Sequence, residues 1–271
     1  MSTEEVEKSL PARGFDGILN ETFVIYGRHF RQFAGLTAVV YVPAQVLVTM
    51  VAFISGVGLI ALIVFNVINL FALLAIYCAT ISGVGQHYVT GDVAVGRCYA
   101  RVLWRTVSML VIGTILAAVT AAGIVAVDVQ SPRLILLVFI LVVAAYMVYL
   151  AVAAPVVIVE GYRSMGALRR SYGLVRRSEW RIIGNLAVYL LVGIGLILVL
   201  FLPFWLVSLG IAPDATTVLS QVVQRIGSII AGVVALPVSF IAATLLYYDL
   251  RVRNEGYNVV RLSKEMGVVA T

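Results

Sequence analysis

Six long apolar segments take up most of this chain and constrain its fold more than any other feature. They run over residues 34–55, 59–84, 107–127, 134–159, 182–209 and 226–248. Each is long enough to cross the roughly 30 Å hydrocarbon core of a bilayer as a helix, which takes about 20 residues. Since 62% of all residues are hydrophobic and only 12% are charged, the composition is not that of a soluble domain. We predict an all-α integral membrane protein with six transmembrane helices.

Polar sequence is confined to the two ends of the chain and to the connections between spans. Residues 1–14 are acidic and polar, which predicts a disordered N-terminus without a cleavable signal peptide. Residues 15–250 form a single six-span membrane domain with no room for a separate catalytic domain. Residues 251–271 are expected to form an amphipathic tail, because the spacing of Val259, Leu262 and Met266 puts them on one helical face. The tail has three possible docking partners: the membrane, this protein's own interfacial helices, and another chain.

Lysines and arginines are distributed unevenly about the predicted spans. Six spans place both termini, and the connections after the second and fourth spans, on one side of the membrane. That side holds 17 of the 19 basic residues, and only Arg133 and Arg225 fall near the other side. The positive-inside rule therefore predicts that both termini are cytoplasmic, the amphipathic tail included.

The cytoplasmic connections carry helical patterns of their own, near residues 15–32, 92–105 and 163–180. In the first, apolar residues recur at helical spacing from Phe15 onward, while polar residues take other faces. The third carries an apolar stripe and a separate arginine face, formed by Met165, Leu168, Tyr172 and Val175 and by Arg169, Arg170, Arg176 and Arg177. Such helices lie in the membrane interface, with the apolar side among acyl chains and the arginines at anionic headgroups.

An internal repeat relates these segments to one another. The stretch GILNETFVIYGRHFRQFAG, from Gly17, aligns without gaps on GALRRSYGLVRRSEWRIIG, from Gly166. A third copy, DVAVGRCYARVLWRTVSM, begins at Asp92 and fits more loosely. The predicted architecture is three parallel repeats, each an interfacial amphipathic helix plus a two-span hairpin, related by an axis along the membrane normal.

Three passages resemble a known bacterial family. They are FDGILNETFVIYGRHFRQFAG near the N-terminus, APVVIVEGYRSMGALRRSYGLVR from Ala154, and ATLLYYDLRVRNEGYNVVRL from Ala243. Together they resemble the multi-pass membrane domain that is attached to some glycerophosphodiester phosphodiesterases and that also occurs alone in uncharacterised proteins. The resemblance implies a bacterial cytoplasmic (inner) membrane. It implies no phosphodiesterase activity, because this chain lacks the soluble domain with the acidic and histidine cluster, and it transfers no functional residues.

Candidate binding residues lie in the third connection and at the ends of spans four and six. They are Arg163, Arg169, Arg170, Arg176, Arg177, Arg181, Glu160, Asp249, Arg251 and Arg253. One interpretation is that the arginines only orient the spans, while the two acids anchor helix ends as exposed ion pairs with Arg163, Arg251 or Arg253. The other interpretation is that these residues bind an anionic lipid headgroup or a partner protein.

Deep polar residues are few, and two uses are open for them. Asn66 and Asn69 are three residues apart on one face of the second span, and Gln45 lies in the first span. Such side chains either hydrogen-bond neighbouring helices or line an intramembrane polar path.

No pattern for catalysis is present. The two histidines, His29 and His87, have no acid and nucleophile in a recognised arrangement, and there is no HExxH, GxSxG, phosphate loop or CxxC motif. We therefore expect no enzyme, no cofactor and no metal site, and the basic residues beside spans do not suggest nucleic acid. The expected function is a non-catalytic membrane module that binds anionic lipid or a partner protein, or forms a homo-oligomer. The alternative is a transporter or permease for a lipid or small amphiphile.

Overall fold

The computed structural model describes residues 14–55, 59–100, 102, 114, 152–162, 164–176, 179–211 and 217–267. The described residues contain helices and no strand, which confirms the all-α prediction. The elements are α2 (Phe15–Arg28), α3 (Phe30–Ser55), α4 (Leu59–Thr90), the π-helical turn η1 (Val156–Glu160), α7 (Ser164–Val175), α8 (Glu179–Ile211), α9 (Val218–Glu255) and α10 (Val259–Met266). Residues 95–100, within the second predicted interfacial segment, are also helical.

Four of the described helices are long and apolar enough to cross a membrane, namely α3, α4, α8 and α9. They correspond to the spans predicted at 34–55, 59–84, 182–209 and 226–248. The spans predicted at 107–127 and 134–159 lie outside the described residues, apart from position 114 and residues 152–159. The structure is therefore that of a helical membrane protein.

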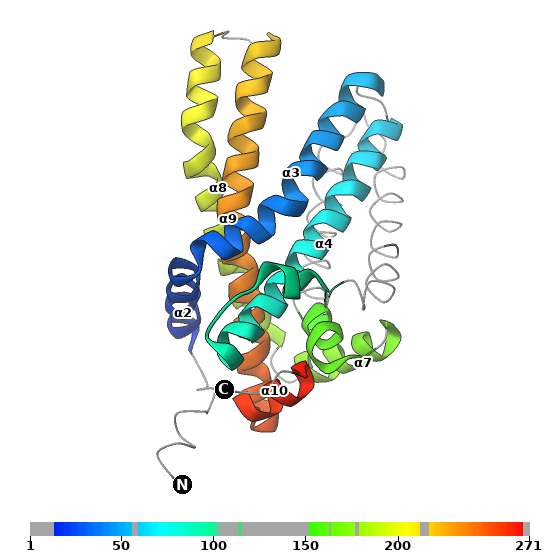
Figure 1. Cartoon of the computed structure of the whole chain (residues 1–271), viewed down its shortest axis with the longest axis vertical. Coiled ribbons are helices and arrows are strands. Elements are labelled where there is room, and N and C mark those ends of the chain that lie inside the picture. The colour runs from blue at the N-terminus through cyan, green and yellow to red at the C-terminus, as the bar shows by residue number, and fades with distance from the viewer. Residues whose placement is uncertain are drawn as a thin grey trace.

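Two long helical hairpins make up the body of the molecule (Figure 1). α3 packs against α4, α8 packs against α9, and α9 also contacts α2, α3 and α4. α7 and α10 lie together at one end of these hairpins, which we call the basal end, while α2 lies beside α9 (Figure 1). Because α9 touches most of the other elements, it forms the centre of the fold.

Burial along α9 is uneven and places the core toward the basal end. Every residue from 241 to 251 is buried, whereas Val218, Leu219 and Val222 in its first turns are exposed apolar residues. Apolar exposure of this kind is suited to acyl chains. Pro237 lies inside α9, where its ring disturbs the preceding turn. The hydroxyl of Tyr26, on α2, donates to the Val234 carbonyl in that turn at 2.7 Å.

The first interfacial helix is shorter than the 15–32 segment predicted for it. α2 ends at Arg28 because the backbone of His29, with φ −120° and ψ 32°, leaves the helical conformation, and α3 begins at Phe30. The break turns the chain from the flank of α9 into the first span. Ile18, Thr22 and Ile25 form the buried face of α2.

Glycines allow close approach between the hairpins. A Cβ at Gly232 of α9 would lie 2.7 Å from Cζ of Tyr41 on α3, well inside van der Waals contact. Gly227 likewise lies against the Phe204 side chain of α8, so both glycines allow close helix packing.

We predict that Gly232→Ala separates α3 from α9 and lowers the free energy of unfolding by about 1–3 kcal/mol. Helix unfolding in mixed detergent micelles, followed by circular dichroism, measures the change. Gly195→Ala on α8 is the matched control, because no atom lies within 4 Å of its Cβ position, and alanine there favours the helix by up to about 1 kcal/mol. Equal stability of the two variants would contradict the packing role of Gly232.

Candidate functional site: a buried ion-pair network

The end of η1 supplies the first member of a polar network at the basal end. Pro155 directly precedes this π-helical turn, and Val156 to Val159 are all buried. Single π-helical turns are rare and frequently occur at functional sites. The chain leaves η1 at Gly161, whose φ of 80° is a conformation that favours glycine. Glu160 is thereby held at the margin of the core, with its side chain only 6% exposed.

The last turns of α9 supply three further members. Tyr247, Arg251 and Glu255 follow one another at intervals of four residues and therefore share one face of the helix. Tyr247 and Arg251 are both buried, and the Arg251 side chain is only 4% exposed. α9 then ends at Gly256, which has a φ of 61° and redirects the chain toward α10.

α10 closes the network from the C-terminal side. The Asn258 side chain caps this helix by accepting a hydrogen bond from the Arg261 backbone N–H at 2.9 Å. Leu262 and Met266 are buried, and Met266 lies over Gly85 of α4, where a Cβ would be 2.8 Å from its methyl carbon. Of the three residues predicted to share one face of a tail helix, Leu262 and Met266 are buried and Val259 packs against the core while partly exposed. The docked partner is this protein's own α4 and η1.

Arg251 is the centre of the network, because it contacts all three glutamates. Its Nη1 and Nη2 donate to the two carboxylate oxygens of Glu265 at 2.7 and 3.0 Å, a bidentate arrangement. Its Nε lies 3.3 Å from Glu255 Oε2 and 3.8 Å from Glu160 Oε1. The guanidinium carbon is 3.7 Å from the ring centroid of Tyr257, whose hydroxyl donates to Glu265 at 2.7 Å.

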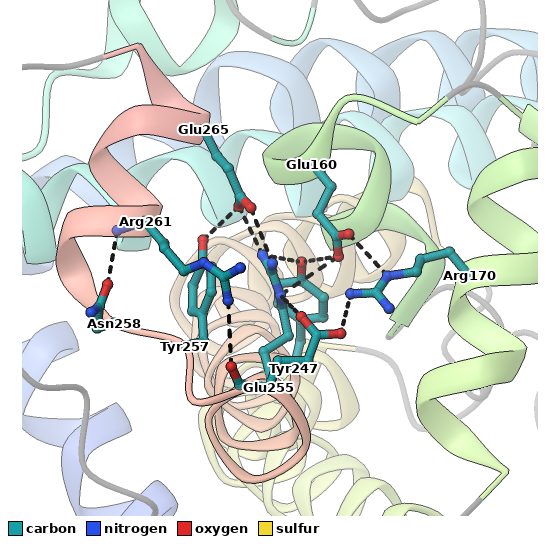
Figure 2. A network of polar contacts seen from close by, with 9 residues as sticks. Glu160, Arg170, Tyr247, Glu255, Tyr257, Asn258, Arg261 and Glu265 are labelled. Carbon is teal, nitrogen blue, oxygen red and sulfur yellow. Dashed lines mark hydrogen bonds and ion pairs between the residues drawn. The ribbon is translucent and has the colours of Figure 1, made fainter.

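Arg170 of α7 completes the network from the other side (Figure 2). Its Nε donates to Glu160 Oε2 at 3.0 Å, and its Nη2 pairs with Glu255 Oε1. Tyr247 donates to the remaining Glu160 oxygen at 2.7 Å. Each of the six carboxylate oxygens of Glu160, Glu255 and Glu265 thus has a partner within the network. Through these contacts the network connects η1, α7, α9 and α10.

Exposure differs between the inside and the edge of the network. Glu160 and Arg251 are the interior pair, whereas the side chains of Arg170, Glu255 and Glu265 are 29%, 21% and 29% exposed. A buried charge that loses its partner is strongly destabilising, while a paired one contributes little net stability compared with apolar residues. The network therefore fixes the relative positions of its elements more than it adds to overall stability.

The pKa values of groups at the edge reflect these contacts. Burial acts to raise the pKa of the Glu265 carboxyl, but hydrogen bonds from Arg251 and Tyr257 hold it below the ordinary value of 4.5. Burial acts to lower the pKa of Arg170, but hydrogen bonds with Glu255 and Glu160 and their charges raise it. Burial is the main cause that raises the pKa of Tyr257. Glu265 is therefore ionised and Tyr257 neutral at physiological pH.

Of the predicted site residues, Glu160, Arg170 and Arg251 come together in the network. Asp249 and Arg253 form a separate pair along α9, with 2.9 Å between Asp249 Oδ2 and Arg253 Nε. The interpretation that these acids pair with Arg251 and Arg253 agrees with the structure, but the acids are not exposed, since their side chains are 6% and 3% exposed. Both acids face the interior because the ends of η1 and α9 are packed against other elements.

The expectation that four arginines share one face of the third interfacial helix is also wrong. Arg170 turns inward beside Ala167, Ser171 and Leu174, the buried face of α7, because that face meets the bundle. Arg169 and Arg176 lie on the outward face and are exposed. Arg163 and Arg177 lie outside the described residues, as does the side chain of Arg181.

Two of the three intramembrane polar residues join neighbouring helices. Gln45 Nε2 of α3 donates to Asn69 Oδ1 of α4 at 2.8 Å, and Asn69 in turn donates to the Phe65 carbonyl at 3.0 Å. Asn66, exposed on α4, also takes part in an interaction within the protein. Of the two uses left open by the sequence, the Gln45 to Asn69 bond is the interhelical one.

Four members of the network were not identified from the sequence: Tyr247, Glu255, Tyr257 and Glu265. The spacing of Glu255 four residues after Arg251 is a local signal for an ion pair on a helix. No local signal connects Tyr257 and Glu265 to Arg251, because their approach depends on the turn at Gly256.

A second polar contact joins the two histidines, with 3.0 Å between His29 Nε2 and His87 Nδ1. It connects the break between α2 and α3 to the end of α4. Within the described ranges, no group of three or more His, Cys, Asp or Glu residues is arranged to hold a metal ion.

We compared the chain with protein families, curated proteins and solved structures. No protein-family model matches the chain. Among curated proteins and among solved structures, none matches either.

We predict that Glu160→Gln lowers the free energy of unfolding by about 3 kcal/mol, because two guanidiniums lose a buried counter-charge. Thermal and detergent-induced unfolding both report this loss. Asp16→Asn, at an exposed position in the first turn of α2, is the control and should change stability by less than about 1 kcal/mol. A Glu160→Gln protein as stable as this control would show that the network is not a structural cross-link.

The lowered pKa of Glu265 makes the docking of α10 dependent on pH. A depressed carboxyl pKa contributes stability that is complete above the unfolded value and is lost as pH falls through the folded value. We therefore predict that α10 stays docked above about pH 5 and detaches as pH falls below the ordinary carboxyl pKa of 4.5. A fluorophore attached to a cysteine at position 264 monitors docking. Glu265→Gln should remove this transition, and an unchanged transition would contradict the assignment.

Proposed function

We propose that this protein is a non-catalytic integral membrane module that binds anionic lipid at its basal end. The observation that carries the proposal is the outward face of α7, where Arg169 and Arg176 are exposed on either side of Tyr172. Tyr172 is 58% exposed, which is unusual for a large aromatic side chain packed in a protein. An aromatic ring between two guanidiniums fits the membrane interface, with the ring at headgroup level and the charges at lipid phosphates.

The inward arginine strengthens this interpretation of the outward pair. Arg170 is neutralised by Glu160 and Glu255, and its contacts fix the rotation of α7 on the bundle. With that rotation fixed, α7 presents Arg169 and Arg176 on the side away from Arg170. Two cations carried by a fixed helix lose less backbone freedom on binding an anion than two carried by a flexible loop.

A similar combination occurs on α2 and at the start of α3. Phe23, Val24 and Phe30 are 47%, 54% and 43% exposed, and Arg28 and Arg31 are exposed beside them. Apolar side chains next to basic ones favour the boundary between acyl chains and headgroups. We therefore propose that α2 also contacts the bilayer on the side away from α9.

The remaining elements of the proposal concern topology and origin. We propose six spans in three repeats, with both termini in the cytoplasm of a bacterium and the protein in its inner membrane. The described basic residues are consistent with this orientation, since Arg251, Arg253, Arg261 and Lys264 belong to the basal end and Arg225 lies near the opposite end of α9 (Figure 1). The resemblance to the membrane domain attached to some glycerophosphodiester phosphodiesterases also implies a bacterial inner membrane.

A partner protein at the same basic face, or a second copy of this chain, would use the same outward residues. Transport of a lipid or small amphiphile was the alternative raised by the sequence, through a path near Gln45, Asn66 and Asn69. The hydrogen bond from Gln45 to Asn69 gives two of these residues a role in helix pairing, and so supports the binding module.

We predict that replacing Arg169 and Arg176 together by glutamine weakens retention of phosphatidylglycerol by roughly thirtyfold, since each basic side chain near an anionic surface contributes about 1 kcal/mol. Native mass spectrometry of protein ejected from nanodiscs of mixed phosphatidylglycerol and phosphatidylcholine measures the ratio of retained lipids.

The control variant is Arg225→Gln, because Arg225 is exposed but lies near the opposite end of α9. It should leave the ratio of retained lipids within about twofold of the wild-type value. If the double variant retains phosphatidylglycerol as the control does, anionic lipid does not bind to the outward face of α7.

A further inference from the structure

The contact between Arg251 and Glu265 has the form of an anion-binding site. The carboxylate is held by two parallel guanidinium hydrogen bonds of 2.7 and 3.0 Å and by the Tyr257 hydroxyl at 2.7 Å. The ring of Tyr257 forms the floor, 3.7 Å from the guanidinium carbon. Bidentate guanidinium donors and a phenol hydroxyl suit a phosphate group as well as they suit a carboxylate.

The residues that form this site and the group that fills it come from different elements. Arg251 belongs to α9, and Tyr257 lies in the connection directly after it, so the site is built without α10. Only the anion itself, Glu265, comes from α10 (Figure 2). Glu265 is also the more exposed partner, at 29% against 4% for Arg251, so its removal would open the site outward.

α10 is stabilised as a helix mainly by its packing against the rest of the protein. It has eight residues, and helices shorter than about 12 residues are marginal in isolation. Glycines with positive φ stand on both sides of it, Gly256 at 61° and Gly267 at 60°. Its buried side consists of Leu262, Ser263 and Met266. Once undocked, it would expose this apolar side.

The opposite side of α10 is suited to a membrane surface. Val260 is 43% exposed, and Arg261 and Lys264 are exposed as well. An undocked α10 would therefore combine an apolar face with basic residues, the composition of a helix that lies in the interface of an anionic bilayer. The two states of α10 differ in which surface covers Leu262 and Met266.

We propose that Glu265 occupies a phosphate-binding site formed by Arg251 and Tyr257, and that an anionic lipid headgroup displaces it and releases α10 onto the bilayer. Exchange of one anion for another keeps the two bidentate donors of Arg251 occupied throughout, whereas release without a replacement would leave Arg251 with only its longer contacts to Glu255 and Glu160. The lipid therefore acts as the effector that changes the population of the two states. This inference rests on the proposed binding of anionic lipid.

The test is hydrogen exchange of residues 259–267 in the full chain, in nanodiscs of phosphatidylcholine alone or with phosphatidylglycerol. We expect amide protection of α10 to fall at least about tenfold with phosphatidylglycerol, while protection of α4 and α9 stays the same and shows that the fold is intact. Glu265→Gln should lower α10 protection in phosphatidylcholine and raise the amount of phosphatidylglycerol retained. Asn254→Gln, at an exposed position in the last turn of α9, is the control and should do neither.

A further arm separates the two sources of phosphate. Glycerol 3-phosphate is added to phosphatidylcholine nanodiscs, and release of α10 there as well would show that the phosphate group alone suffices. Release only with phosphatidylglycerol assigns the site to a lipid headgroup. Unchanged α10 protection in a protein that retains phosphatidylglycerol overturns the displacement but leaves lipid binding intact. Failure of wild-type protein to retain phosphatidylglycerol overturns both proposals.

Discussion

The buried guanidinium of Arg251 is the group on which the basal end of the structure depends. A cation with 4% of its side chain exposed needs counter-charges and hydrogen-bond acceptors within the protein. Glu160, Glu255 and Glu265 provide them from η1, α9 and α10, and Arg170 adds α7 by sharing two of these acids. The contacts of Arg251 and Arg170 therefore connect all four elements at the basal end.

Much of the fold could be predicted from local sequence, whereas the site depended on contacts that are remote in sequence. Long apolar runs identify α3, α4, α8 and α9 because the requirement to span a bilayer acts on each segment separately. The apolar side of α10 was also readable from its spacing. The inward turn of Arg170 was not, since it depends on which side of α7 meets the bundle. Tyr257 and Glu265 were missed because the turn at Gly256 brings them back to Arg251.

Neighbouring arginines on α7 have opposite roles for a simple geometric reason. Successive residues of a helix point about 100° apart, so Arg169 faces outward while Arg170 reaches the acids behind it. Charge counts along a sequence cannot separate the two, and both satisfy the positive-inside rule. The inward arginine fixes the helix, and the outward arginines present charge to the surroundings. This division connects the buried network to the proposed lipid surface.

Several partners in the network are far apart in sequence, so they are synthesised at different times. Glu160 and Tyr247 are 87 residues apart, and Arg170 and Glu255 are 85 apart. At about 5–20 residues per second, a ribosome needs roughly 4 to 17 seconds to make the intervening chain. Glu160 and Arg170 are only 10 residues apart and can pair during that interval. The end of α9 can then pack against the Glu160 and Arg170 pair that formed before it, so the network is completed only after α9 and α10 have been synthesised.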